Sequence, residues 1–163
     1  MIMKSSSHAI FLEGKKANRG ISHTVRAAQT TITTEEMIFA LHVPPTFNST
    51  ENRIVSEPGL LTLTTDGTKA VTFRVYRNPI LGGSPVFTDV ETGETPIKLS
   101  STAGVTITSG MPILTFELAK AESQPFMIKG ETDDWVQGDT FVITAQSPVN
   151  TDPSAALTYK DFQ

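Results

Sequence analysis

The densest group of side chains able to do chemistry is an acidic cluster in which Asp133 and Asp134 lie between Glu131 and Asp139. Loop carboxylates can bind Ca²⁺, but an EF-hand loop alternates its ligands around a central glycine, and this segment lacks that spacing. We therefore interpret the cluster as a solvated loop. A calcium-dependent rise in melting temperature, lost when Asp133 and Asp134 are both alanine, would instead establish a metal site. We predict no metal and no cofactor.

The other reactive residue types form no recognisable motif. The three histidines, His8, His23 and His42, have no histidine partner at i, i+3 or i+4 and no carboxylate at ligand spacing beside them. Gly82-Gly83-Ser84 lacks the Lys-Ser/Thr and the helix of a phosphate-binding loop. The sequence has no G-x-S-x-G elbow and no cysteine. Paired carboxylates that could face across a glycosidase cleft are not evident either. We predict that the protein is not an enzyme.

Exposed aromatic side chains would indicate glycan binding, and the chain offers few candidates. Trp135, the only tryptophan, is either a solvent-facing platform or a lid over one end of the core, and the lid is the more common role of a lone tryptophan. Tyr76 shares the polar side of its expected strand with Arg74. That side is therefore a candidate contact surface.

Basic residues gather at the start of the chain. Residues 1–34 hold five of them against one acidic residue, a net +4, whereas residues 35–163 hold eight basic and 16 acidic residues, a net −8. This asymmetry predicts an extended basic arm over 1–34 on an acidic body. The arm would bind an acidic protein surface or a neighbouring copy, or would be a solvated tail. The acidic body disfavours nucleic acid. The candidate anchoring residues are Lys15, Lys16, Arg19 and Arg26.

The elements that must position these residues are strands. In Ala70–Pro79, Val71, Phe73 and Val75 alternate with polar side chains, which is typical of a half-buried strand that Pro79 then ends. Gly110–Lys120 and Gly138–Ser147 alternate in the same way and are expected to flank it in one sheet.

Two further segments help to define the fold. Thr33–Pro45 carries a possible helix capping box, but it alternates and is too short for a typical helix, so we predict a strand. Asp66-Gly67 favours a tight hairpin between Leu60–Thr65 and Ala70–Asn78. Short strands separated by turn residues at intervals of about 8–12 residues indicate an all-β antiparallel two-sheet sandwich, jelly-roll-like, of about eight strands over 35–163. No apolar run approaches the roughly 18 residues of a membrane span.

With these strands placed, the chain resembles small virion structural proteins of tailed bacteriophages. The resemblance rests on the order of several phrases, which are TTEEMIFALHV (Thr33–Val43), AVTFRVYRNPILGGSPVFTDVETG (Ala70–Gly93), GMPILTFELAK (Gly110–Lys120), GDTFVITAQS (Gly138–Ser147) and SAALTYKDF (Ser154–Phe162). Proteins of this kind resemble capsid decoration, head-fibre or tail-associated modules and are commonly trimeric. The resemblance supplies no catalytic motif.

The resulting expectation is a noncatalytic capsid decoration or cement protein. It would be a homotrimer on the virion surface, present in the host cytoplasm during assembly, and bound through its arm to the major capsid protein or another virion protein, with no membrane partner. The alternative is a tail or head-fibre module that binds a host receptor or glycan.

Overall fold

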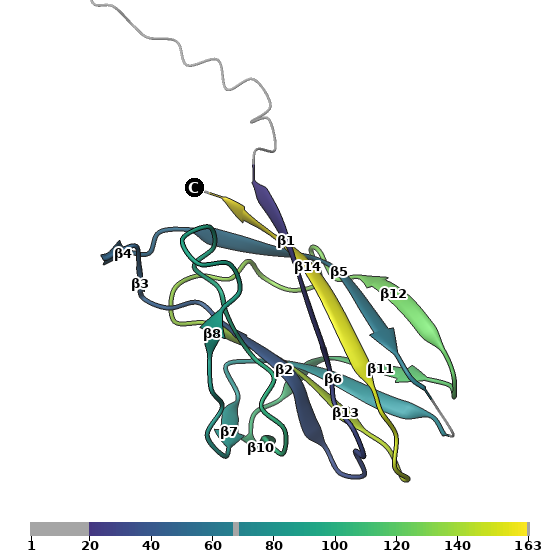
Figure 1. Ribbon diagram of the computed structural model, residues 1–163. Coiled ribbons are helices and arrows are strands. Elements are labelled where there is room, and N and C mark those ends of the chain that lie inside the picture. The colour runs from purple at the N-terminus through teal and green to yellow at the C-terminus, as the bar shows by residue number, and fades with distance from the viewer. Residues whose placement is uncertain (1–19, 67–68, 163) are drawn as a thin grey trace, which may run out of the picture.

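The computed structural model describes residues 20–66 and 69–162, and they form two antiparallel sheets packed face to face (Figure 1). The four-stranded sheet has the order β1 (Ile21–Ala28), β14 (Ser154–Phe162), β5 (Val55–Thr64), β12 (Ser123–Met127). The six-stranded sheet has the order β11 (Pro112–Leu118), β6 (Val71–Arg77), β13 (Thr140–Gln146), β2 (Glu36–His42), β9 (Lys98–Ser100), β8 (Thr88–Asp89). Two smaller pairs are β7 (Ile80–Gly82) with β10 (Thr106–Ser109), and β3 (Thr46–Phe47) with β4 (Thr50–Glu51).

The eight principal strands pair from the outside of the chain inward. The first pairs with the last, β1 with β14, and β2 pairs with β13, β5 with β12, and β6 with β11. These four pairs are the successive parts of one long antiparallel ribbon. When the ribbon is rolled up, β14 pairs with β5 and β13 pairs with β6, and these contacts complete the two sheets. The arrangement is a jelly roll, and the predicted all-β sandwich is confirmed.

The core lies between the two sheets. Val71, Phe73 and Val75 of β6 are fully buried there, and β11 and β13 flank β6 as the alternating patterns predicted. Burial of large apolar side chains from both sheets supplies the main stabilising free energy of such a sandwich. Their partners include Phe39, Leu61, Leu63, Phe141, Ile143 and Leu157. The strand predicted within Thr33–Pro45 is present as β2.

A second, smaller core covers the outer face of the six-stranded sheet. Between β6 and β11 the chain inserts residues 78–111, which carry β7 to β10. Leu81, Phe87 and Ile107 of this insertion pack on buried residues of the sheet, which include Tyr76 and Val142. Tyr76 is only 4% exposed, so the prediction that its side of β6 is a contact surface is wrong.

Glu35 satisfies the polar groups on this covered face. Tyr76 Oη and Thr144 Oγ1 each donate to Glu35 Oε1 at 2.7 Å, and Arg74 Nη1 donates to Oε2 at 2.9 Å. Burial, and then the hydrogen bond to Glu35, raises the pKa of Tyr76 to about 12.

Two predictions about chain connections are corrected by the topology. The strands on either side of Asp66-Gly67 do not form a hairpin, because β5 and β6 lie in different sheets. The Asp66 carboxylate instead accepts hydrogen bonds from Thr151 Oγ1 and the Asp152 amide. The predicted arm over 1–34 is also too long, because residues 21–28 form β1, paired along its whole length with β14.

Candidate attachment site

The described chain enters and leaves the sandwich at the same end. Ile21, the first residue of β1, lies opposite Asp161 of β14. Gly20 packs so closely against Phe162 that an added Cβ would lie 2.9 Å from the Phe162 ring. Figure 1 shows β1 and β14 side by side, with the beginning of β1 next to the C-terminus. Any segment that precedes Gly20 therefore starts from this end.

A buried polar cluster lies beside the beginning of β1 here. Asp161 accepts hydrogen bonds from Ser56 Oγ and, at 2.6 Å, from Thr95 Oγ1. His23 Nε2 lies 3.5 Å from Asp161 Oδ2, and its Nδ1 lies 3.3 Å from Glu91 Oε2. Thr95 and Glu91 belong to the loop between β8 and β9, so the cluster joins the edge of one sheet to the edge of the other.

The surroundings of this cluster are apolar and close-packed. The His23 ring stacks on Tyr159 with 5.3 Å between centroids, and the side chains of His23 and Asp161 are almost fully buried. Burial raises the pKa of Tyr159. The hydrogen bonds from Ser56 and Thr95 satisfy the buried Asp161 carboxylate. Neither ring nitrogen of His23 makes a hydrogen bond to a described residue, so β1 is held here by the stacking of His23 on Tyr159 and by its pairing with β14.

Sequence reasoning missed this cluster. His23 had no carboxylate near it in the sequence, because its partners are Glu91 and Asp161, on distant segments. The readable signal was local: His23, Val25 and Ala27 alternate with Ser22, Thr24 and Arg26, the period of a half-buried strand.

A small hairpin projects from the sandwich beside the chain ends. β3 and β4 are joined by Asn48 and Ser49, with φ of 49° and 64°, as a tight turn with two positive φ angles requires. After the hairpin the chain enters β5, whose Val55 pairs with Phe162. The hairpin therefore lies two strands away from the entry of β1.

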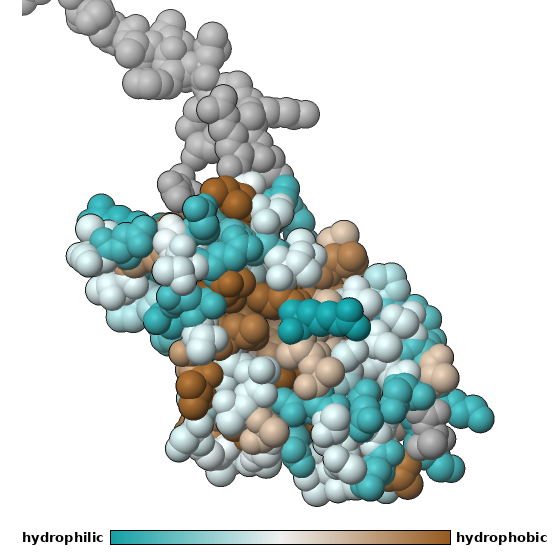
Figure 2. All heavy atoms as spheres, viewed as in Figure 1, coloured by the Kyte–Doolittle hydropathy of each residue, from teal (hydrophilic) through white to brown (hydrophobic). Residues whose placement is uncertain are grey.

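Two hollows flank this hairpin, and we call them the hairpin hollows. One, of about 350 Å³, is lined by Phe47, Asn48, Thr50, Glu51, Asn52, Arg53 and Ile54. The other, of about 190 Å³, lies against the β8–β9 region and is lined by Pro44, Thr46, Phe47, Asn48, Asp89, Thr92, Gly93, Thr95, Pro96 and Lys98. Figure 2 shows hydrophilic surface over the hairpin and hydrophobic surface between the β8 segment and β1.

The structure separates the predicted anchoring residues. Lys15, Lys16 and Arg19 lie outside the described residues. Arg26 lies on β1 opposite Ala156, six residues and therefore about 20 Å from Gly20. Its side chain is exposed and lines a different hollow, of about 280 Å³, together with hydroxyl groups of β5, β12 and β14. Arg26 is thus not part of the chain-entry end.

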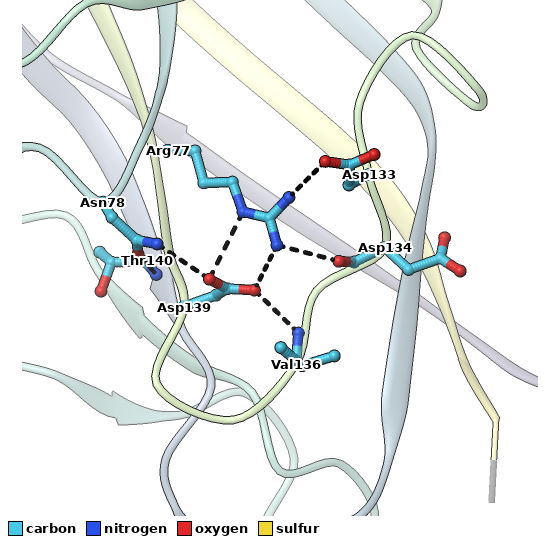
Figure 3. Close-up of polar contacts among 7 residues, drawn as sticks. All are labelled: Arg77, Asn78, Asp133, Asp134, Val136, Asp139 and Thr140. Atoms are coloured by element: carbon cyan, nitrogen blue, oxygen red, sulfur yellow. Dashed lines mark hydrogen bonds and ion pairs between the residues drawn. The ribbon is translucent and has the colours of Figure 1, made fainter.

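The acidic cluster is organised by an arginine (Figure 3). Arg77 at the end of β6 donates to Asp139 Oδ2 at 2.8 Å and to Asp133 Oδ2 at 3.1 Å, and its Nη2 also reaches the Asp134 carbonyl. Asp139 further accepts from Asn78 Nδ2 and the Val136 amide, each at 2.9 Å. The guanidinium thus supplies the positive charge between these carboxylates.

Asp139 is the buried member of this network. Burial opposes ionisation of Asp139, but the hydrogen bonds from Arg77, Val136 and Asn78 outweigh it and lower its pKa below the ordinary value. The network holds the loop over Trp135, which is 1% exposed and packs between Phe141 and Tyr159. The lid interpretation of Trp135 is confirmed, and the solvent-facing platform is not.

Within residues 20–66 and 69–162, no three histidine or acidic side chains gather in a way that could hold a metal ion. No helix in the same ranges is long and apolar enough to cross a membrane.

Comparison of the chain with protein-family models, curated proteins and solved structures finds no match.

Proposed function

We propose that this protein is a noncatalytic structural protein of a tailed-bacteriophage virion. Specifically, it is a capsid decoration or cement protein, a homotrimer that binds the assembled shell through residues 1–19. The observation that carries the proposal is the division of charge at Gly20. Residues 1–19 hold Lys4, Lys15, Lys16 and Arg19 against Glu13, a net +3, which leaves nine basic and 16 acidic residues, a net −7, for the rest of the chain.

The fold supports this proposal by analogy. Jelly rolls are common in viral capsid and lectin domains, but a fold alone does not define a function. The rigid entry at β1 adds a physical reason. β1, the strand that follows residues 1–19, pairs with β14 along its whole length, and its His23 is buried beside Asp161 and Glu91. A pull on that segment would therefore be transmitted into the sandwich rather than to a loose strand.

The alternative of a receptor- or glycan-binding fibre module loses its sequence support. That alternative required Trp135 and Tyr76 to face outward, and their side chains are 1% and 4% exposed. An aromatic side chain must present its face to solvent to stack on a sugar ring.

A deletion tests the proposal. Because β1 begins at Ile21, deletion of residues 2–19 leaves every described strand intact. We expect the shortened protein to fold but to lose co-sedimentation with assembled shells, and the full chain to sediment with them. The matched control is the full chain with Arg26→Ala, which alters a basic residue away from the entry end and should keep binding. Retained binding after the deletion would overturn the assignment of attachment to residues 1–19.

A further inference from the structure

The hairpin hollows provide a surface suited to an extended basic and apolar peptide. Their walls include Phe47, Pro44, Pro96 and Ile54, which offer apolar contact. Their charged residues include Glu51 and Asp89, and Glu91 and Glu94 follow in the adjoining loop, against Arg53 and Lys98. Within the lining, Glu51 pairs with Arg53 at 2.9 Å and Asp89 pairs with Lys98 at 3.2 Å, so these four charges cancel. The net charge of −2 in this region comes from Glu91 and Glu94, in the adjoining loop.

Residues 1–19 have the complementary chemistry. They carry a net +3, and they contain the apolar run Ala9-Ile10-Phe11-Leu12 three residues before Lys15 and Lys16. The run Ala9–Leu12 would contact the apolar walls, and Lys15 and Lys16 would lie toward the excess acidic charge of Glu91 and Glu94.

The point of entry places this segment next to the hollows. Gly20 contacts Phe162, Phe162 pairs with Val55, and Ile54 lines the larger hollow. Two strand spacings amount to about 10 Å, whereas 19 extended residues span up to about 60 Å. The segment can therefore reach the hollows of its own chain without any rearrangement of the sandwich.

Because residues 1–19 are joined covalently to the sandwich, they would bind the hollows of their own chain in preference to those of a second copy. A segment joined by a short linker experiences an effective concentration on the order of millimolar at a nearby site, above the concentration at which a free protein is normally present. We propose that residues 9–16 dock in the hairpin hollows of their own chain in the free protein. The inference rests on the proposed function for the identity of the competitor, since the segment must leave the hollows to bind the shell.

Cross-linking of the full chain tests this docking, and the natural absence of cysteine makes it clean. One variant combines Ala9→Cys with Thr46→Cys, which lies on the smaller hollow and is exposed. The matched control combines Ala9→Cys with Ser123→Cys, exposed on β12 at the far edge of the four-stranded sheet. We expect a short bismaleimide to link the first pair within one chain at least about fivefold faster than the control pair, at a rate independent of protein concentration.

Charge reversal sharpens the result. Glu51→Lys with Asp89→Lys, added to the Ala9/Thr46 cysteine pair, should bring the linking rate down to that of the control. Glu117→Lys, on β11, should leave the rate unchanged. Equal rates for the two cysteine pairs, or products of dimer mass, would overturn docking within one chain. An unchanged rate after reversal of Glu51 and Asp89 would overturn the charge argument.

The two proposals fail in different ways. Loss of shell binding on deletion of residues 2–19, together with cross-linking at the control rate, would keep the proposed function and reject the docking. Fast cross-linking within one chain, together with shell binding that survives the deletion, would keep the docking and reject the proposed function.

Discussion

The two sheets of the sandwich differ in what lies on their outer faces. Along β14 of the four-stranded sheet, buried residues alternate strictly with half-buried ones, because the outer face of that strand is open. Along β13 of the six-stranded sheet, five consecutive residues are buried, because residues 78–111 cover the outer face. The insertion thus turns an ordinary half-buried sheet into a central layer.

This difference explains why polar side chains on the two outer faces have different hydrogen-bond partners. Thr158 and Thr62, on the open face, can bond to water. Thr144 and Tyr76, on the covered face, cannot, and they share the carboxylate of Glu35 instead. A covered sheet face therefore depends on particular hydrogen bonds that an open face does not need.

The largest expected effect is a charge placed on each outer face. Val142→Asp would bury a carboxylate in the second core, where Val142 is fully buried, and should cost about 4 kcal/mol or more of unfolding free energy. Thr158→Asp, on the open face of β14, should change it by less than about 0.5 kcal/mol. Urea unfolding measures both, and similar losses in the two variants would contradict the comparison.

An intermediate effect is expected where the covered sheet ends, at Asp139. Asp139→Asn should lower the unfolding free energy by about 2–3 kcal/mol at neutral pH, because Arg77 would lose its buried partner. Asp134→Asn is the control, since Figure 3 shows the Asp134 carboxylate directed away from Arg77. That variant should be neutral within about 0.5 kcal/mol.

The pH dependence of Asp139 has a definite sign. Its folded pKa is lower than its unfolded one, so its stabilisation is complete above the unfolded value of about 3.9 and is lost as the pH falls through the folded pKa. The difference in unfolding free energy between the wild type and Asp139→Asn should therefore be constant near neutrality and shrink below about pH 4. A difference that grows in acid would contradict the pairing.

The smallest effect is expected for Tyr76→Phe, which removes one hydrogen bond to Glu35 and leaves the ring in place. The loss should be about 1 kcal/mol in urea unfolding at pH 7. Because the folded pKa of Tyr76 is raised to about 12, the stabilisation by its neutral hydroxyl is complete below the unfolded value of about 10 and is lost as the pH rises toward 12. Tyr159→Phe is not a suitable control, since Tyr159 lies in the Asp161 cluster. Thr62→Ala on the open face is the better one and should be nearly neutral.

For the six-stranded sheet, the sequence predicted the central strands and their inward faces correctly, but it did not predict that the outer face is covered. Alternation in Val71, Phe73 and Val75 identifies the face toward the main core, and β11 and β13 flank β6 as expected. The same alternation placed Tyr76 in solvent. Whether a second layer covers a sheet depends on where residues 78–111 return, and the pattern of a single strand carries no information about that.

The candidate site was less accessible still to sequence reasoning. The charge asymmetry pointed to the start of the chain, but the boundary at residue 34 was wrong because β1 uses His23 and Ala27 at inward positions, where a typical strand has branched aliphatic residues. Glu91 and Asp161 are distant from His23 in the sequence and come close to it only when the strands have assembled into the jelly roll. Asp66-Gly67 misled for a related reason, since a turn dipeptide does not specify whether the chain returns to the same sheet.

The pairing of the first principal strand with the last has a consequence for biosynthesis. A ribosome releases β1 long before β14, so β1 has no partner strand until the other described strands have been made. Until β14 has been made, the hydrogen-bonding edge of β1 is unpaired and His23 cannot contact Asp161. The proposed attachment segment is therefore joined to an ordered strand only late in synthesis. A nascent chain, or one truncated before β14, would carry that segment on an unpaired β1.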